Sequence, residues 1–375
     1  MQKDSLTKPR VVHFVTGGFS GATQVAVDLC LAANASQAMS VKLVLRKKRS
    51  TAAIKIKALQ DQGLDVEVVP GWSHFATILA LKRICQKWQP DILVAHGFSE
   101  HIWGRMAGLW AQVPALVHVE HNSRERYTAW RLKLSLWLAS KTDALVGVSE
   151  GVKSRLIELG FPKDKCTAIS NGVDWSKFQE GSSRTWSQRL PHVIMASRFA
   201  KQKDQPTLIQ AMRILKAQQV QTRLSIAGLG KNRLLQQSQK ISANWGLTQH
   251  IDFLGHVGNM PELLAKHQIF VLSTHYEGMP LALIEAMASG CACIGTDVVG
   301  VREVIAHGVT GLLVPENDAQ AMADAIAMLL KDPEKAENLG IAARAAVKQN
   351  FTLQVMNDNY TRLLLQLYRP NKART

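Results

Sequence analysis

The sequence contains no apolar run that approaches the roughly 18 residues needed to span a bilayer. The first ten residues, MQKDSLTKPR, lack the apolar core of a signal peptide. The five cysteines are odd in number and scattered, so we expect reduced core residues rather than a disulfide framework or a zinc site. These absences predict a cytoplasmic protein.

Several ligand signatures are also absent. No Asp-x-Asp occurs in the 375 residues, so a metal ion that bridges a diphosphate is not predicted. The turn Gly228-Leu229-Gly230 lacks the third glycine of a dinucleotide fingerprint, because Arg233 stands there, which argues against an NAD site. There is no zinc-finger, RRM, KH or helix-turn-helix pattern, although the net charge is +16. We therefore predict no metal, no cofactor and no nucleic acid, and expect the basic surface to meet anionic lipid or phosphorylated substrates.

The stretch that is most informative is residues 269–290, IFVLSTHYEGMPLALIEAMASG. It predicts a buried strand, a polar loop and a helix that opens at Pro280, whose first N–H groups can bind an anion. Glu277 and Glu285 stand eight residues apart, roughly 12 Å on a continuous helix, which is wider than a glycosidase carboxylate pair. We expect them to bind hydroxyl groups on both sides of a diphosphate. The alternative is one solvated turn glutamate and one on the helix face.

Short apolar strands alternate with helical patterns along the whole chain, which predicts parallel, doubly wound α/β sheets. The polar stretch 175–190 predicts a linker between residues 1–180 and residues 190–352, and a last helix is expected from residue 353. The predicted strands are 11–15, 41–45, 66–69, 91–95, 115–119, 144–148, 167–169, 192–196, 224–227, 251–253, 269–272, 293–295 and 311–314.

Two cations and three histidines follow predicted strands. Arg198 and Lys203 come after the strand 192–196, so they point to the crevice where open α/β sheets bind ligands. His118 lies within the strand that precedes His121, so we expect a core residue there and a functional one at His121. His96 also ends a strand and is a further candidate for substrate contact, although for each histidine alone a structural role is the alternative.

Glu277 and Glu285, set in EGMPLALIEAMASG, give the chain a resemblance to the retaining glycosyltransferases of the GT-B fold, most similar to family 4. The resemblance implies an α/β fold of two Rossmann-like domains that face a central cleft. It implies that residues 1–180 form the acceptor-side domain and residues 190–352 the nucleotide-sugar donor domain. In this family the last helix, here 353–375, crosses back onto the first domain.

The resemblance also implies roles for single residues. Arg198 and Lys203 would hold the leaving diphosphate, Glu285 the ribose, and Glu277 the donor sugar. His121 would lie near the reacting carbon, and His96 on the acceptor side. Further residues implied to line the donor are Gly17, Gly18, Gly228, Val257, Gly278, Met279, Pro280 and Leu281.

The implied activity is the transfer of a hexose-type sugar from a nucleoside diphosphate sugar, expected to be a UDP-sugar, with retention and without metal. The acceptor would be a glycan or a lipid-linked precursor, as in lipopolysaccharide or another surface polysaccharide. Two alternatives remain: another GT-B sugar-nucleotide enzyme, such as a 2-epimerase, or a non-catalytic membrane- or glycan-binding module.

Two basic clusters predict reversible attachment to an anionic membrane on its cytoplasmic face. The first is Arg46-Lys47-Lys48-Arg49, followed by Lys55 and Lys57, and the second is Arg124, Arg126, Arg131 and Lys133. In helical form Tyr127, Trp130, Leu134 and Trp137 make one apolar stripe, which fits an interfacial helix. The alternative is that this stripe packs into the core.

Overall fold

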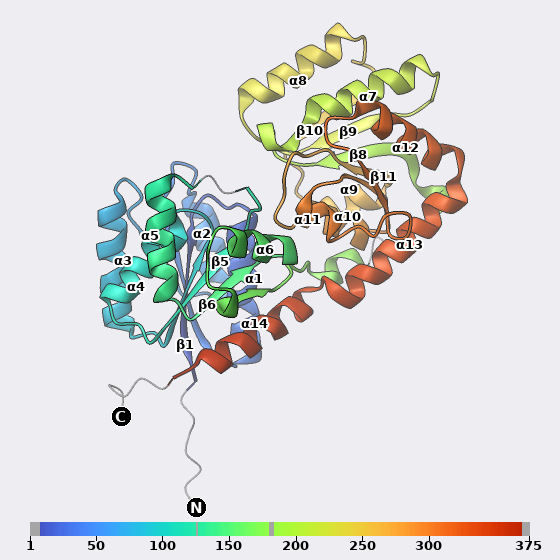
Figure 1. Ribbon diagram of the computed structural model, residues 1–375. Helices are drawn as coiled ribbons and strands as arrows, with labels where there is room; N and C mark the ends of the chain where they lie inside the picture. The colour runs from blue at the N-terminus through green and yellow to red at the C-terminus, as the bar shows by residue number, and fades with distance from the viewer. Residues whose placement is uncertain (1–7, 125–126, 180–183, 370–375) are drawn as a thin grey trace, which may run out of the picture. The chain divides into compact units, whose positions relative to one another are not determined.

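The computed structural model describes residues 8–124, 127–179 and 184–369 (Figure 1). The contacts between residues divide the chain into two compact units. Unit 1 comprises Met1–Asn171 and Leu353–Thr375, and unit 2 comprises Gly172–Thr352. The division therefore falls at Asn171, earlier than residue 180, and the final helix belongs to unit 1.

Unit 1 is built on a seven-stranded sheet with the order β3-β2-β1-β4-β5-β6-β7. All the neighbouring strands are parallel, and the β-branched and apolar residues of β1, β2, β4, β5 and β6 are buried on both faces, as a sheet covered by helices requires. The chain turns from β1 outward to β3 and then returns to β4, so the strand order reverses between β1 and β4. The strands are β1 (Arg10–Thr16), β2 (Ser40–Arg46), β3 (Val66–Val69), β4 (Ile92–His96), β5 (Ala115–Glu120), β6 (Ala144–Gly147) and β7 (Cys166–Ala168).

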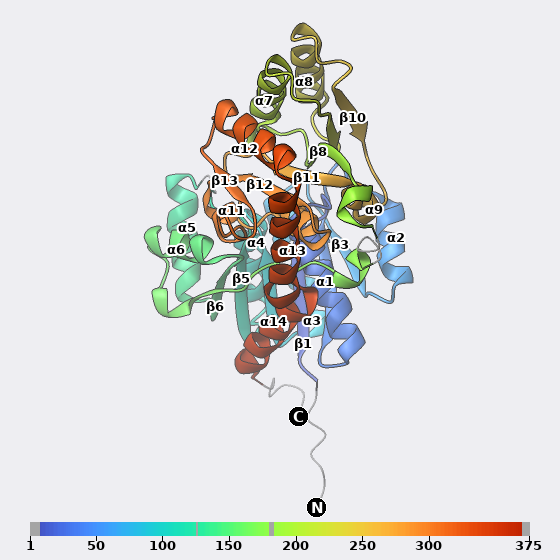
Figure 2. The same cartoon turned by 90° about the vertical axis from the view of Figure 1, so that its right-hand side faces the viewer.

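Helices pack on both faces of this sheet. Helix α4 lies between α3 and α5 on one face, and α14 packs beside α1 on the other (Figures 1 and 2). Gly104 of α4 allows close approach, because a Cβ there would stand 2.7 Å from the Phe14 ring. The helices are α1 (Gly21–Ser36), α2 (Ala53–Asp61), α3 (His74–Trp88), α4 (Glu100–Trp110), α5 (Ala129–Ser140), α6 (Glu150–Glu158) and α14 (Leu353–Leu367).

Unit 2 repeats the architecture with a six-stranded parallel sheet of order β10-β9-β8-β11-β12-β13. Here the strand order reverses between β8 and β11. In such sheets the loops at the carboxyl ends of the two strands separate at this point and leave room for a ligand. The strands are β8 (Leu190–Ala196), β9 (Leu224–Ala227), β10 (Ile251–Gly255), β11 (His267–Leu272), β12 (Ala292–Thr296) and β13 (Leu312–Val314).

The helices of unit 2 enclose a core of buried aliphatic residues from β8, β9, β11 and β12. Helix α7 packs between α8 and α12, and α13 packs against α10 and β12. These helices are α7 (Gln205–Ala217), α8 (Asn232–Asn244), α9 (Met260–Ala265), α10 (Leu281–Ala288), α11 (Val299–Arg302), α12 (Ala319–Lys331) and α13 (Pro333–Asn350).

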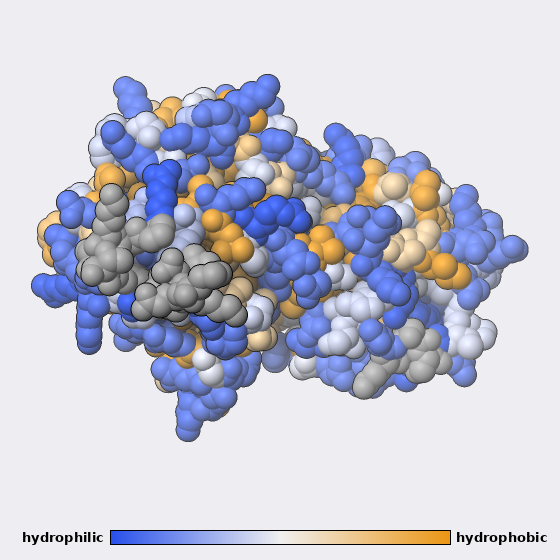
Figure 3. All heavy atoms as spheres, turned by 90° about the horizontal axis from the view of Figure 1, so that it is seen from below, coloured by the Kyte–Doolittle hydropathy of each residue, from blue (hydrophilic) through white to orange (hydrophobic). Residues whose placement is uncertain are grey.

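The thirteen predicted strands are all confirmed, most with ends shifted by one or two residues. The predicted linker 175–190 instead contains short 3₁₀ turns at Trp175–Phe178 and Trp186–Gln188, and its last residue already belongs to β8. Hydrophilic side chains dominate the face drawn in Figure 3, and apolar ones form scattered patches. Within the described ranges, no helix combines the length and the apolar character that crossing a bilayer would demand.

Candidate active site

The predicted donor-site residues of unit 2 gather at the carboxyl ends of β8 and β11, where the strand order of the sheet reverses. Arg198 lies two residues beyond β8, and Lys203 ends the 3₁₀ turn η5 (Lys201–Lys203). Glu277 lies in the loop after β11, and Glu285 on the following helix α10. Residues far apart in sequence are thus brought to the position at which open α/β sheets bind their ligands.

Lys203 and Glu277 form a nearly buried ion pair. The ammonium of Lys203 contacts Glu277 Oε1, and their side chains are 14% and 8% exposed. Thr274 Oγ1 donates to the same carboxylate oxygen at 3.0 Å. Arg198, by contrast, is exposed and has no ion-pair partner among the residues that the structure describes. Of the two predicted phosphate ligands, Arg198 is therefore open to an incoming anion, while Lys203 already holds a carboxylate.

Gln202 ties the turn η5 to the Glu277 loop. Its side-chain amide donates to Tyr276 O at 2.6 Å. Its carbonyl accepts from the His275 backbone N–H at 2.8 Å and lies 2.9 Å from Thr274 Oγ1, whose single proton it shares with Glu277 Oε1. These contacts hold the turn η5 against the loop after β11. They therefore fix the position of Lys203 relative to Glu277.

The start of α10 offers backbone N–H groups. No side chain caps this helix, and Pro280 occupies its N-cap position. Uncapped N–H groups and the helix dipole favour an anion at this end. Gly278 and Met279 are buried in the preceding loop. The loop packs against α11, since a Cβ on Gly300 would stand 2.4 Å from Gly278 O.

The helix α10 begins at Leu281, one residue later than predicted, and Gly290 follows its end with φ +75°. This left-handed conformation is the one that makes glycine favourable beyond a helix C-terminus. Glu285 is half-buried on this helix, and Leu281 is half-buried rather than a core residue.

Gly228 brings the β9 loop against the β8 loop. Its φ is +136°, and a Cβ there would stand 2.1 Å from Ser197 O, so no side chain fits. Its N–H donates to Gly255 O at 2.7 Å, which joins the loops after β9 and β10. Val257 is half-buried in the β10 loop. The carboxyl edge of the sheet is therefore closely packed on the β9 and β10 side of Arg198.

In unit 1, Gly17 and Gly18 follow β1, but they differ in role. Gly17 is buried, its N–H donates to Arg46 O at 2.8 Å, and a Cβ would stand 2.7 Å from Thr51 Oγ1. Gly17 is thus required by packing against the segment after β2. Gly18 is half-buried, and a Cβ there would make only ordinary contacts, the nearest at 3.5 Å from Thr16 Oγ1. Of the two, Gly18 is the better placed for backbone approach to a ligand.

The three predicted histidines of unit 1 are placed differently from one another. His118 is fully buried in β5, so its core assignment is confirmed. His121 lies half-buried just beyond β5. The suggestion that His96 contacts the acceptor is wrong, because His96 is 0% exposed and both its ring nitrogens face other histidines. His96 Nε2 lies 3.0 Å from His13 Nδ1, and His96 Nδ1 lies 3.3 Å from His121 Nε2.

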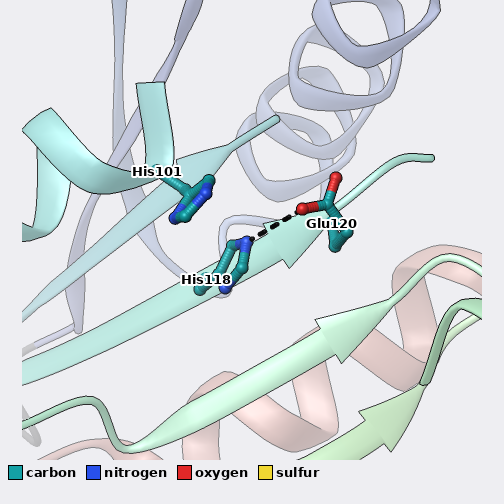
Figure 4. A group of neighbouring side chains, drawn as sticks. All are labelled: His101, His118 and Glu120. Carbon is teal, nitrogen blue, oxygen red and sulfur yellow. Dashed lines mark ion pairs between the residues drawn. The ribbon is translucent and has the colours of Figure 1, made fainter. Parts of the chain in front are cut away.

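A second histidine cluster has the composition of a metal site. His101, His118 and Glu120 bring three possible ligand atoms within 4.8 Å of one another (Figure 4). The two imidazole rings, however, are stacked with centroids 3.9 Å apart, so their in-plane lone pairs do not converge on one point. Arg105 Nη2 lies 2.8 Å from His101 Nδ1, and Tyr127 Oη lies 3.1 Å from His101 Nε2. These residues therefore do not fit a cation.

The same cluster holds the segment that carries His121. Glu120 Oε1 accepts from the His121 backbone N–H at 2.9 Å, and Glu120 Oε2 accepts from Tyr127 Oη at 3.4 Å. Burial lowers the pKa of His101 and of His118 well below the ordinary value, so both rings are neutral at neutral pH. Nothing in the sequence singles out Glu120, because it stands there only at the end of a predicted apolar strand segment.

The predicted basic run after β2 divides into two environments. Arg46 is buried and lies 3.3 Å from Glu100, so it is not part of a surface patch, contrary to prediction. Its Nη2 also lies 2.9 Å from His74 Nδ1. Lys47 and Arg49 are exposed, as are Lys55 and Lys57 on α2. In the second cluster Arg124 and Lys133 are exposed and Arg131 is half-buried, and Arg126 lies outside the described residues.

The predicted aromatic stripe is not a single face. Helix α5 begins at Ala129, so Tyr127 precedes it, and Tyr127 and Leu134 are half-buried against apolar neighbours. Trp130 and Trp137 are instead 54% and 49% exposed. Two further aromatics after β3, which the sequence analysis missed, are more exposed still: Trp72 at 85% and Phe75 at 61%.

The chain matches two family models in succession. Residues 19–177 match the model described as Glycosyltransferase Family 4, and residues 179–346 match the model described as Glycosyl transferases group 1. The two matches follow one another along most of the sequence and correspond closely to units 1 and 2.

Individual proteins give the same assignment. The chain is 29% identical over 242 residues to N-acetyl-alpha-D-glucosaminyl L-malate synthase of Bacillus anthracis, which covers 62% of each chain. It is 24% identical to the capsular polysaccharide biosynthesis glycosyltransferase CapM of Staphylococcus aureus over 76% of this chain and 79% of CapM. Among solved structures, HepE of Anabaena in complex with UDP-glucose matches with a TM-score of 0.84 and 20% identity, over 95% of this chain and 99% of HepE.

Proposed function

Because the chain belongs to the family 4-like glycosyltransferases of the GT-B fold, we propose that it transfers a hexose-type sugar from a UDP-sugar with retention of configuration. The structure of HepE with UDP-glucose supports the choice of donor. The likeness to CapM supports a role in the synthesis of a surface polysaccharide. The acceptor is then a glycan or a lipid-linked precursor, such as one of lipopolysaccharide.

The observation that carries the proposal is the set of groups at the carboxyl ends of β8 and β11. An exposed guanidinium, an ammonium paired with a carboxylate and an uncapped helix start meet at the ligand position of the sheet. Arg198 offers two parallel N–H donors to a phosphate, and the first N–H groups of α10 offer more. This combination suits a diphosphate that gains charge as the sugar leaves, because preorganised donors stabilise developing charge.

The remaining residues take roles on either side of the diphosphate. Glu285 binds the ribose hydroxyls, and Glu277 binds hydroxyls of the donor sugar and holds its reacting carbon. Glu277 is already fixed by Thr274 and Lys203, so it presents a positioned carboxylate. Lys203 shares its charge between Glu277 and the β-phosphate. The leaving phosphate assists attack on the same face of the sugar, and His121 supports the acceptor side.

We also propose that the reaction needs no metal ion. The sequence has no Asp-x-Asp to hold one against a diphosphate. Within the part of the chain that the structure describes, one group of His and Glu has ligand spacing, and its stacked rings do not converge on a cation. The cationic groups Arg198 and Lys203 would then supply the positive charge that a bridging metal supplies elsewhere.

A panel of nucleotide sugars tests the donor, because a ligand at 100 times its Kd adds about 2.7 kcal/mol of stability. We expect UDP-sugars to raise the melting temperature and GDP- or ADP-sugars to leave it unchanged. Release of UDP should require an acceptor, and the anomeric signal of the product should match that of the donor. UDP release without acceptor would favour an epimerase, and an inverted product would contradict retention.

The exposed aromatics and cations of unit 1 support peripheral attachment to an anionic membrane. The loops after β2 and β3 are in direct contact, since the Lys47 N–H donates to Val69 O at 3.0 Å. The loops present Lys47, Arg49 and Trp72 to solvent, and Phe75 is exposed in the first turn of α3. Aromatic rings beside cations suit the interface of a bilayer, where each Lys or Arg contributes about 1 kcal/mol of attraction.

Co-sedimentation with liposomes tests the attachment. Binding should require anionic lipid, fall with added salt, and weaken in the double variant Lys47→Gln, Arg49→Gln. The matched control is Lys331→Gln, Lys335→Gln, which removes two exposed charges from unit 2. Equal recovery with neutral and anionic vesicles, or equal loss in both variants, would contradict the proposal.

A further inference from the structure

Three histidines form a continuous row from the interior of unit 1 to the carboxyl edge of its sheet. His13 lies within β1, His96 ends β4, and His121 follows β5. His13 Nδ1 lies 3.0 Å from His96 Nε2, and His96 Nδ1 lies 3.3 Å from His121 Nε2. The row therefore crosses the point between β1 and β4 at which the strand order of the sheet reverses.

Two members of the row occupy buried strand positions that ordinarily hold apolar side chains. His13 and His96 are 2% and 0% exposed, in a sheet whose neighbouring residues are aliphatic or aromatic. A buried polar ring without a partner costs roughly 1–3 kcal/mol, so each ring depends on its neighbour in the row. The apolar segment VVHFV would hold a valine at the position of His13 without this need. The histidines thus stand at positions where packing alone does not call for them.

All three rings are neutral at neutral pH. Burial lowers the pKa of His13 and of His121 to about 4 and that of His96 well below the ordinary value. A neutral imidazole carries one proton, on one of its two nitrogens. Each contact in the row needs one donor and one acceptor. The tautomer of one ring therefore dictates the tautomer of the next.

Two arrangements satisfy the row. In one, His13 Nδ1 and His96 Nδ1 carry protons, His121 Nε2 accepts, and the proton of His121 sits on Nδ1. In the other, each proton moves to the opposite nitrogen, and His121 Nδ1 becomes an acceptor. The nitrogen of His121 that is free of the row, Nδ1, is therefore a donor in the first arrangement and an acceptor in the second, and it cannot be both while the two contacts of the row are kept.

The inner end of the row lies at a cavity. His13 lines a cavity of about 160 Å³ between α1 and α14, together with Leu29, Met39, Val41 and Tyr360. The Tyr360 hydroxyl is buried and has no hydrogen-bond partner among the described residues. The environment of His13 is therefore enclosed, whereas that of His121 is the carboxyl edge of the sheet. Because the two ends of the row lie in different surroundings, the two arrangements differ in free energy, and the favoured one also decides the tautomer of His121.

We propose that His13 and His96 are positioning residues that hold His121 in one tautomer and one ring orientation, so that its Nδ1 offers a single hydrogen-bonding character to the substrate. The inference rests on the proposed role of His121 in sugar transfer. In metal sites, removal of the group that holds a ligating histidine in place typically lowers metal affinity or activity by 10–100-fold. We expect an effect of similar size here.

The test uses matched substitutions at His13 in the full-length protein. Asn places an amide where Nδ1 of His13 stands, so His13→Asn can keep the contact with His96. Gln places its amide at the position of Nε2, so His13→Gln loses that contact. Tyr360→Phe is the control in the same cavity, because it removes a hydroxyl that has no partner. Melting temperatures of all variants report whether each one folds.

The first readout is the ¹⁵N spectrum of histidine-labelled protein at neutral pH, assigned through His121→Asn. We expect His121 to show one tautomer in the wild type, in His13→Asn and in Tyr360→Phe, and a mixture in His13→Gln. A mixture in the wild type, or a single unchanged tautomer in His13→Gln, would overturn the inference. If His13→Gln does not fold, His96→Gln provides the same comparison one ring closer to His121.

The second readout is steady-state transfer. His13→Gln should lower kcat by about 10-fold or more with little change in the donor KM, and His13→Asn should recover most of the loss. Equal kcat in the Asn and Gln variants would also overturn the inference. If His121→Ala transfers sugar at the normal rate, the proposed role of His121 fails, whereas the ¹⁵N spectra still decide whether the row fixes its tautomer.

Discussion

Breaking the ion pair between Lys203 and Glu277 should destabilise unit 2 strongly, even though each residue is proposed to act on substrate. The Lys203→Met substitution keeps the length of the side chain and removes its charge. It leaves the Glu277 carboxylate, which is 8% exposed and accepts a hydrogen bond from Thr274 Oγ1, without the ammonium that neutralises its charge. A buried charge that loses its partner bears the full cost of its desolvation.

The magnitude follows from the exposure of the pair. Exposed pairs contribute about 0–1 kcal/mol, whereas removing one partner of a buried pair costs about 3–5 kcal/mol. With side chains 14% and 8% exposed, the pair belongs near the lower end of the second range. For a unit of 150–250 residues each kcal/mol shifts the melting temperature by roughly 2–4 °C. We expect Lys203→Met to lower it by roughly 6–12 °C.

Differential scanning calorimetry of five proteins tests this reasoning: the wild type, Lys203→Met, Glu277→Gln, the double variant and a control. Lys201→Met is the matched control, since Lys201 lies exposed on the same turn and should melt within about 1 °C of the wild type. The double variant Lys203→Met, Glu277→Gln should recover much of the loss, because it leaves no buried charge. A Lys203→Met protein that melts like the control, or a double variant whose loss is the sum of the single losses, would refute a desolvated and coupled pair.

Four further outcomes are expected. Arg198→Ala should lower kcat by about 100-fold or more, with Lys201→Ala as the neutral control, and near-normal turnover would reject its role at the diphosphate. Glu285→Ala should weaken donor binding by about 1.5–3 kcal/mol, so an unchanged donor KM would contradict ribose contact. Activity should survive EDTA, and a loss restored by Mg²⁺ or Mn²⁺ would contradict a metal-free reaction. Burial lowers the pKa of His13 and His121 from 6.5 to about 4, so the unfolded chain binds protons there that the folded chain does not. The free energy of unfolding should then fall as pH drops from 6.5 towards 4, by up to about 1.4 kcal/mol per pH unit for each histidine, and equal urea midpoints in wild type and His13→Asn across this range would contradict it.

The sheets could be predicted because each strand is a short apolar run bounded by polar residues, and burial on both faces leaves little alternative. Helix α8 was not singled out, since its sequence NRLLQQSQKISAN is mostly polar and buries only Ser238 and Ser242 fully. Its hydrophobic side is carried by half-buried residues such as Leu234 and Leu235. A sparse apolar face of this kind is hard to separate from a loop by pattern alone.

The candidate site was predicted best where residues follow strands directly. Arg198 and Glu277 lie in the loops that follow β8 and β11, so the topology of the unit 2 sheet places them at one edge, and His121 directly follows β5 of unit 1. The pairing of Lys203 with Glu277 could not be predicted, because it depends on the bonds that Gln202 makes across 74 residues of sequence. The complete burial of His96 could not be predicted, because strand periodicity does not show how far below the surface a ring at a strand end lies.

The charges at the carboxyl ends of β8 and β11 explain how two cations can lie near one another there before any anion binds. Two free cations side by side would repel one another by about 1 kcal/mol even in water at 4 Å, and by more in a partly buried site. Here Glu277 holds Lys203 and Gln202 fixes both, while Arg198 remains exposed on the neighbouring loop. Under the proposed function, a diphosphate would meet Arg198 and the start of α10 first, and would then share Lys203 with the Glu277 carboxylate, which we propose to bind the sugar. In the proposed reaction, the carboxylate that neutralises Lys203 would in this way couple the position of the sugar to the charge on its leaving group.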